Sequence, residues 1–570
     1  MRNKILLTAG IVAAVSITLA GCTYNDGGSS GSTSGPAESQ VITVDYEGSA
    51  EAPAAEVVDA VSGGEVIIAD ESPFESTDPA ALNVSAARSV GTELLFRTLT
   101  TYLTDGESGD TSLVGDLATN AGSANEDDTV WTYTLREGIT FEDGTPITAQ
   151  DVAYGIARSF TTLGVAGEQN LQDALDPDRA YQGPYDGELL PPGVTTPDEQ
   201  TIVFTLDQPT PLLPYFLSTA NTSPVPADAD TRQSYGSEFV STGPYRLGEY
   251  VPEQYMVLVR NEGWDPETDP VRHQYPDSYR IEFNVSASTQ VQRALASQGA
   301  DGNLLGSSNV PQQDMPSVTG DDEANIIAGA IPATYFITIN TERVTDLAVR
   351  QALNYAIDRD GLAKARGGVN VATPLNTILP SALVGYVESD TYPMSPDVEA
   401  AEKALDGQTP ELTYCYANST LGNGDAVVVQ SSLEAAGFKI NLNPIEGASY
   451  VSTVRNPDSG CDLFFFSWAP AYPDPSAVMN PLLNGASGIN LSLLDDKAVN
   501  DELATLAGES DRAVAAPQYG ELDKTVMTDQ VPMIPTVSEN VYQLAGSNVK
   551  GSFVNPIRSF PSLVNIYLEQ

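Results

Sequence analysis

The chain has 570 residues, of which 41% are hydrophobic, and its 77 acidic and 26 basic residues give a formal net charge of −51. This length supports large hydrophobic cores in roughly two to four domains. The negative charge excludes nucleic acid as a partner, and the single histidine, His273, excludes a zinc, nickel or haem site built from several histidines. We interpret the charge as adaptation of an exported protein to salt or the cell wall; a cationic substrate is the alternative.

The first 22 residues have the pattern of an export signal. Arg2 and Lys4 precede an apolar stretch that closes with Leu19-Ala20-Gly21-Cys22. A run of about 15 apolar residues is shorter than the roughly 20 of a membrane-spanning helix. Leu-Ala-Gly-Cys resembles the bacterial lipobox, in which the thiol receives diacylglycerol before cleavage. We therefore predict a signal peptide over residues 1–21 and a lipid on Cys22 that anchors the protein to the outer face of the cell membrane.

The segment behind the cysteine is rich in Gly, Ser, Ala and acidic residues, and it contains no Lys or Arg before Arg88. Such a chain behaves as a random coil, and forty residues of it give a reach of roughly 35 Å. We therefore expect a flexible acidic linker over residues 22–64, which would let the folded body meet both a ligand and a partner in the membrane.

Strand and helix patterns alternate behind the linker. The first half predicts a helix at residues 85–99 and strands at residues 65–69, 130–135, 201–206 and 256–259. Thr148 is expected to cap a second helix, with Asp151 in its first turn, where the helix dipole favours a negative charge.

The second half predicts a mixed α/β sheet with helices on its faces. Its expected strands are residues 334–339, 412–416, 438–442 and 462–468, and its expected helices are residues 347–357 and 425–436. Cys415 lies in one of these strands and Cys461 at the start of another. An even pair in an exported protein favours a disulfide, with two free buried thiols as the alternative.

Four sequence blocks carry a family resemblance. They are WTYTLREG with FEDGTPITAQDV (131–138 and 141–152), STGPYR with VRNEGW (241–246 and 259–264), VRQALNYAIDR (349–359) and SWAPAYPDP (467–475). In this order, with the lipobox and this length, they resemble the extracellular substrate-binding lipoproteins of ABC importers, family 5, of peptide and nickel type. The resemblance covers nearly the whole body behind the linker.

The resemblance implies an α/β fold of the type II periplasmic-binding-protein class, with two α/β lobes around a ligand cleft and an additional inserted domain. Domain I would be discontinuous, and its closure onto domain III about a hinge would bury the ligand. The implied bounds are 65–102, 223–330 and 536–570 for domain I, 103–222 for domain II and 331–535 for domain III.

The resemblance also implies that the fourth block lines the cleft. Trp468 would form an aromatic wall, and the backbone around Ser467 and Ala469 would pair with an extended peptide. Peptide binders of the family carry an Asp for the ligand's α-ammonium where this chain has Ala471, which predicts weaker recognition of a free N-terminus. The full set of expected ligand contacts is Ser85, Tyr335, Ser467, Trp468, Ala469, Ala471, Tyr472 and Asp474.

The expected function is that of a monomeric binding protein that captures a peptide or another small solute and delivers it to the permease subunits of an ABC importer. We expect no cofactor and no metal. The sequence has no GxSxG motif in a strand-turn-helix context, no HExxH and no GxxxxGK[ST], so we predict that the protein is not an enzyme. The alternatives are a sensor or adhesion lipoprotein without a permease and, less favoured, a secreted hydrolase.

Overall fold

The computed structural model describes residues 42–82, 85–106, 109–162, 169–185 and 187–569. All of them belong to one compact unit, Pro36–Gln570. The predicted signal peptide, Cys22 and the linker as far as residue 41 lie outside the described residues. Within the described ranges, no helix is both long enough and apolar enough to cross a membrane.

A five-stranded sheet forms the first layer around which the chain folds. Its order is β12-β2-β11-β10-β9, with β2 parallel to β11 and β12 and the other pairs antiparallel. Successive side chains point to opposite faces of the sheet, which places Val66, Ile68, Tyr279 and Ile281 in one core and Ile67 and Ala69 in another. The bounds are β2 (Glu65–Ala69), β9 (Tyr245–Val251), β10 (Tyr255–Arg260), β11 (Ser278–Glu282) and β12 (Leu304–Gly306). The strands predicted at 65–69 and 256–259 are confirmed.

A six-stranded sheet forms the second layer, in the order β14-β18-β13-β17-β15-β16. Strand β15 is parallel to its two neighbours, β16 and β17, and the other pairs are antiparallel, so the predicted mixed sheet is confirmed. The bounds are β13 (Ile326–Ile339), β14 (Ala372–Pro374), β15 (Glu411–Ala417), β16 (Lys439–Ile445), β17 (Leu463–Trp468) and β18 (Met533–Leu544).

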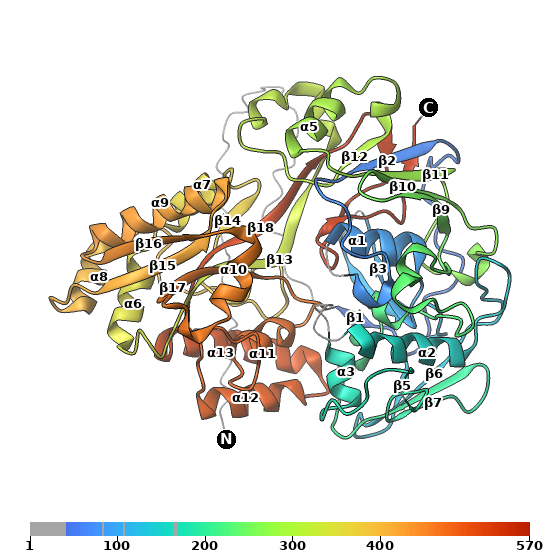
Figure 1. Cartoon of the computed structure of the whole chain (residues 1–570), viewed down its shortest axis with the longest axis horizontal. Helices are drawn as coiled ribbons and strands as arrows, with labels where there is room; N and C mark the ends of the chain where they lie inside the picture. The colour runs from blue at the N-terminus through green and yellow to red at the C-terminus, as the bar shows by residue number, and fades with distance from the viewer. Residues whose placement is uncertain (1–41, 83–84, 107–108, 163–168, 186, 570) are drawn as a thin grey trace, which may run out of the picture. The chain divides into compact units, whose positions relative to one another are not determined.

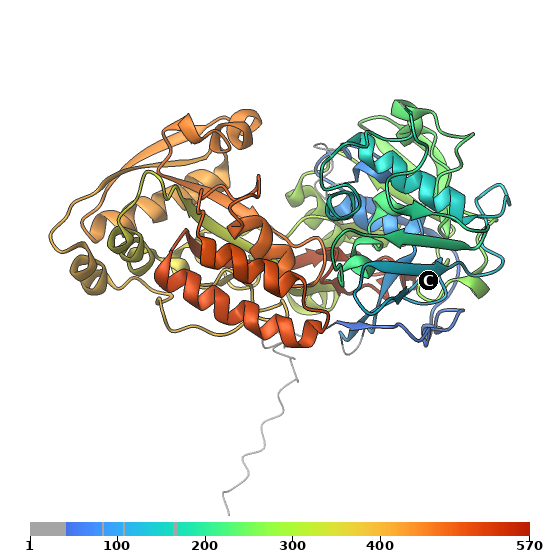
Figure 2. The same cartoon turned by 90° about the horizontal axis from the view of Figure 1, so that it is seen from below.

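Helices cover both faces of this sheet. One core contains α6, α7, α8 and α9, and a second core on the opposite face contains α11, α12 and α13 (Figure 1). Helices α12 and α13 pack side by side in both views (Figure 2). The bounds are α6 (Leu347–Ala356), α7 (Arg359–Ala365), α8 (Val398–Leu405), α9 (Thr420–Ala435), α10 (Gly447–Val454), α11 (Ser476–Leu483), α12 (Lys497–Ala507) and α13 (Arg512–Asp529).

Strands β13 and β18 run from the six-stranded sheet to the five-stranded sheet (Figure 1). Leu305 at the edge of the five-stranded sheet bridges Ala545, just beyond β18. The register of β13 against β18 shifts between Ala330 and Thr334, and Pro332 lies within this interruption, where a missing backbone N–H is tolerated. The sequence predicted only the part of β13 from Thr334 onward, because the preceding Gly and Pro are poor strand formers.

A four-stranded antiparallel sheet, β5-β6-β8-β7, packs against α2. Trp131 and Tyr133 of β6 are buried, as their alternation predicts. The predicted cap is confirmed: Thr148 Oγ1 accepts from Asp151 N, and Asp151 Oδ2 accepts from Thr148 N at 2.9 Å. The bounds are β5 (Ser123–Ala124), β6 (Val130–Thr134), β7 (Val194–Thr195), β8 (Thr201–Thr205), α2 (Ala149–Ser159), α3 (Asn170–Leu175) and α4 (Leu213–Phe216).

Short elements complete the fold, and one of them lies in the predicted linker. Thr43–Val44 form β1, which pairs with β4, and Ala54 N donates to Asp269 O at 2.9 Å. Ordered sequence therefore starts before Glu65, the predicted first folded residue. The other short elements are α1 (Ser85–Ser89), α5 (Ala287–Ala296), β3 (Thr100–Thr104), β4 (Thr111–Gly115), β19 (Val549–Lys550), β20 (Val554–Asn555), β21 (Phe560–Pro561) and β22 (Tyr567–Leu568).

Two predicted helix bounds are wrong. The helix expected over residues 85–99 continues past α1 only as a π-helical stretch to Leu95, and Phe96 is extended, with φ −124° and ψ 130°. The β-branched threonines that follow Arg97 favour strand β3 instead. Helix α9 starts at Thr420 rather than at residue 425, because Ser419 caps it by accepting from Gly422 N at 3.0 Å.

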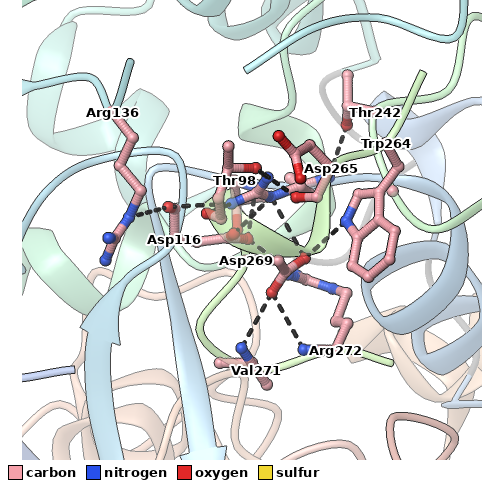
Figure 3. Close-up of polar contacts among 12 residues, drawn as sticks. Thr98, Asp116, Arg136, Thr242, Trp264, Asp265, Asp269, Val271 and Arg272 are labelled. Carbon is pink, nitrogen blue, oxygen red and sulfur yellow. Dashed lines mark hydrogen bonds and ion pairs between the residues drawn. The ribbon is translucent and has the colours of Figure 1, made fainter. Parts of the chain in front are cut away.

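A buried network of four alternating charges joins the segment before β3 to the loop that follows β10 (Figure 3). Arg97 Nε lies 2.8 Å from Asp116 Oδ1, and Arg272 contacts Asp116 Oδ2 at 2.9 Å and Asp269 Oδ2 at 3.2 Å. The indole of Trp264 donates to Asp269 at 3.0 Å. Burying charge is costly unless each charge is paired, so these four residues stabilise one another only as a complete set.

Candidate functional site

A cavity of about 730 Å³ lies where the loops after β2 and β12 face strands of the six-stranded sheet. One wall is formed by residues 70–75 and 307–311. The opposite wall comes from β13, β14 and β18, together with Arg366 after α7 and Ala469 after β17. A cavity of this size with apolar walls and a few converging polar groups is the usual form of a small-molecule site.

The charged residues of this cavity are predominantly acidic. Among the described lining residues there are four carboxylates, of Asp70, Glu71, Glu75 and Glu539, and one guanidinium, of Arg366. Burial raises the pKa of Asp70, although backbone and side-chain hydrogen bonds from Ser72 and Ser307 oppose that shift. In the part of the chain that the structure describes, no group of three or more His, Cys, Asp or Glu side chains is arranged to hold a metal ion.

Tyr335 connects the two charged side chains of the six-stranded sheet's wall. Its hydroxyl donates to Glu539 Oε2 at 2.6 Å, and its ring lies 4.4 Å from the guanidinium carbon of Arg366. Arg366 also lies over the ring of Phe465, at 5.0 Å, and donates to Asp425 Oδ2 at 2.6 Å. Burial raises the pKa of Glu539, and the hydrogen bond from Tyr335 and the charge of Arg366 oppose that shift.

The structure brings two of the expected ligand contacts, Tyr335 and Ala469, into this cavity. Ser467 is exposed on β17 directly opposite Tyr335 in the strand register. Trp468 is not among the lining residues: it packs against the core beneath α11–α13, and its Nε1 donates to Ala477 O at 2.7 Å. Ser85 is the first residue of α1, and its neighbour Ala86 lines the cavity.

The remaining three expected contacts lie in the loop behind β17 and do not line the cavity. Ala471 packs against the core of the four-stranded sheet, and the buried Tyr472 contacts the rings of Tyr215 and Phe216. Asp474 is buried in an ion pair with Arg512 at 2.8 Å and accepts from Ser476 N at 2.9 Å. These contacts hold the loop in place.

Sequence reasoning missed the charged residues of the cavity. Glu539 is an acidic residue inside the otherwise apolar and polar-neutral strand β18, and Arg366 follows the last turn of α7. A charged residue within a buried strand is unusual unless it is paired, and this was the signal available for Glu539. Arg366 and the acidic residues 70 and 71 stand in loops or at helix ends, where charge is ordinary.

Cys415 and Cys461 form a disulfide, with their Cα atoms 5.7 Å apart. The bond joins β15 to the residues just before β17, within a small core that includes Tyr450 and Phe464. It therefore fastens two neighbouring strands of the sheet that forms one wall of the cavity.

Comparison with known proteins gives consistent results. Residues 112–490, more than half of the chain, match the model of the bacterial extracellular solute-binding proteins, family 5. The probable D,D-dipeptide-binding periplasmic protein of Escherichia coli K12 is 25% identical over 483 residues, which are 81% of this chain and 86% of that protein. The periplasmic murein peptide-binding protein of the same organism is 26% identical over 76% of this chain and 81% of its own length.

Solved structures extend the likeness to the fold. The clavulanic acid biosynthesis oligopeptide binding protein 2 superposes with a TM-score of 0.82 at 26% identity, covering 90% of this chain and 96% of that one. Haemophilus influenzae OppA, in complex with the peptide RPPGFSPFR, gives a TM-score of 0.71 at 19% identity over 90% of this chain and the whole of that one. At the lower identity the likeness concerns the fold alone.

Proposed function

Because this chain belongs to the bacterial extracellular solute-binding proteins of family 5, we propose that it captures a peptide or peptide-like solute in the 730 Å³ cavity and delivers it to a membrane permease. The observation that carries the proposal is the cavity itself, with walls from the loops of one sheet and the strands of another and with Tyr335 and Ala469 in its lining. The names of two relatives, which describe binding of a D,D-dipeptide and of a murein peptide, support the peptide class.

The fold is of the type II periplasmic-binding-protein class, as the resemblance implied. We further propose the expected division into domains, with domain I at 65–102, 223–330 and 536–570, domain II at 103–222 and domain III at 331–535. In this division the chain passes between domains I and III within β13 and again within β18. These two paired strands would then be the hinge about which the cavity closes on its ligand.

We also propose that Cys22 carries the lipid that keeps the protein at the cell membrane, near its permease. The support is the Leu-Ala-Gly-Cys motif behind a short apolar segment. Substitution of Cys22 by Ala is expected to move the protein from the membrane fraction to the soluble fraction. Retention of the variant in the membrane would contradict the anchor.

Native mass spectrometry of the purified chain tests the proposed function directly. A co-purified mass between those of a dipeptide and a pentapeptide is expected, together with thermal stabilisation by peptides in a screen that also contains sugars and cations. Stabilisation by sugars alone would contradict the peptide class. Cleavage of any peptide or glycoside in the panel would show a hydrolase instead.

The delivery step needs a cellular measurement. Cells that lack this chain are expected to lose uptake of the peptide that stabilises it, while cells that lack an unrelated binding protein keep that uptake. Unchanged uptake would favour a sensor or adhesion role for the same fold.

A further inference from the structure

The charge of the cavity is not balanced by its own residues. Arg366, the single cation among the described lining residues, is already paired with Asp425, whose side chain is 6% exposed. One guanidinium therefore faces Asp425 as well as the carboxylates of Asp70, Glu71 and Glu539. Uncompensated negative charge in a partly closed site favours a positive ligand, because low-dielectric walls strengthen the attraction.

Glu539 is the carboxylate whose surroundings most resemble a prepared binding group. It is partly buried on β18, the second strand of the sheet, where it pairs with Ala372 of β14 and lies opposite the interruption in β13. Among the described residues only its Oε2 is hydrogen-bonded, to the hydroxyl of Tyr335 at 2.6 Å, so Oε1 is left to accept from a bound molecule. The hydrogen bond fixes the direction of the carboxylate before any ligand arrives.

The acidic residues of the facing wall differ from Glu539 in their surroundings. Glu71 is exposed and accepts from Ala287 N at 3.1 Å, and Asp70 accepts from Ser72 N at 3.0 Å. Both groups add to the negative potential of the cavity. Solvent screens the exposed charge of Glu71, whereas Asp70 is partly buried, as Glu539 is, and is hydrogen-bonded within its own loop.

We propose that the cavity selects solutes that carry an ammonium or guanidinium group, and that Glu539, oriented by Tyr335, is the residue that receives this cation. The inference rests on the proposed function, because it names the class of peptide-like solute that the same cavity takes. A charge-assisted hydrogen bond from the ligand would then replace water at Glu539 Oε1.

Isothermal titration of the full chain, purified in detergent, with two tripeptides tests the inference. Both carry an N-terminal acetyl group and have the sequence Ala-Lys-Ala, and in one of them the lysine is Nε-acetylated, which removes its charge. The charged peptide is expected to bind on the order of ten- to hundred-fold more tightly. In Glu539→Gln this difference is expected to disappear while the affinity for the uncharged peptide stays the same.

Glu434→Gln is the matched control. Glu434 is exposed on α9 and lies outside the cavity lining, so this variant changes the net charge equally and should keep the preference. Thermal melting of both variants verifies that they fold. Equal binding of the two peptides to the wild-type chain would overturn the cation preference and leave peptide capture standing. If Glu539→Gln loses the same factor in affinity for both peptides, the role of Glu539 is overturned. If neither peptide binds the wild-type chain, the proposed function is overturned together with this inference.

Discussion

The hydroxyl of Tyr335 on β13 donates to the carboxylate of Glu539 on β18 across 204 residues of sequence, and both side chains line the same cavity. Tyr335 thereby positions the negative charge of Glu539 and, through its ring, supports the guanidinium of Arg366. The two strands that carry this pair are also those that we propose as the hinge. A ligand bound at Glu539 would therefore contact the segment that has to bend when the cavity closes.

Removal of the Tyr335 hydroxyl should make binding of the charged tripeptide more sensitive to acid. The hydrogen bond stabilises the ionised form of Glu539 and so opposes the rise in pKa that burial causes. In Tyr335→Phe the pKa of Glu539 rises further, and the carboxylate is protonated at a higher pH. Titrations between pH 4 and 8 should show that, on acidification, the variant loses affinity for the lysine peptide at a higher pH than the wild type does. Superimposable pH profiles would contradict this coupling.

A free N-terminus should give no advantage to a peptide that already carries a lysine. Ala471 has no carboxylate and packs against a core outside the cavity lining, so it offers nothing to an α-ammonium. Ala-Lys-Ala with a free amine and its N-acetylated form are therefore expected to bind within about threefold of each other. Much tighter binding of the free amine, measured by titration, would show that another group recognises the N-terminus.

Neutralising one member of the buried charge network should destabilise the protein strongly. Burial by itself raises the pKa of Asp269, but Arg272 and Arg97 hold it below its ordinary range. Asp269→Asn leaves positive charge uncompensated and is expected to lower the free energy of unfolding by about 3–5 kcal/mol in urea denaturation. Asp127→Asn, at an exposed position, should change it by no more than about 0.5 kcal/mol.

The pH dependence of this network follows from the sign of the shift. Because the folded pKa of Asp269 lies below its value in the unfolded chain, its contribution to stability is present above the unfolded pKa and is lost as the pH falls through the folded pKa. Wild-type stability should therefore drop steeply in acid, and Asp269→Asn should lack that part of the drop. Equal acid sensitivity of the two proteins would contradict the pairing.

Asp523 on α13 should make the free energy of unfolding fall as the pH rises. This is the opposite of the effect of Asp269, and it occurs in a separate pH range. Burial raises the pKa of Asp523 to about 7, although the backbone amides of Leu379 and Ile378 donate to it at 2.8 and 3.1 Å. The folded protein therefore holds this proton more tightly than the unfolded chain does. The free energy of unfolding is expected to fall by a few kcal/mol as the pH rises from about 4 to about 7.

Comparison with Asp523→Asn isolates this effect, because the variant has no group to ionise at that position. The stability of the variant relative to the wild type, measured in urea at pH 4.5 to 8, should improve as the pH rises to about 7 and level off above it. A constant difference across this range would show that Asp523 ionises normally.

Much of the fold could be predicted from local sequence patterns. Short apolar runs identified β2 and β17, alternation of apolar residues identified β6, and the Thr148–Asp151 pair identified the start of α2. Local patterns failed where a distant contact decides the conformation. The chain leaves the helix after Leu95, and Arg97 lies in the buried charge network beside Asp116 and Asp269.

The sequence by itself determined the export motif, the strand and helix periodicities and the order of the four family-like blocks, because each of these depends on residues within one turn, one strand or one short segment. Only the tertiary structure decided that Trp468 packs against a core while Glu539, Tyr335 and Arg366 meet at a cavity. The physical reason is that the hydrogen bond between Tyr335 and Glu539 depends on the pairing of β13 with β18. Such pairing is fixed by burial of the whole sheet, which no local pattern contains.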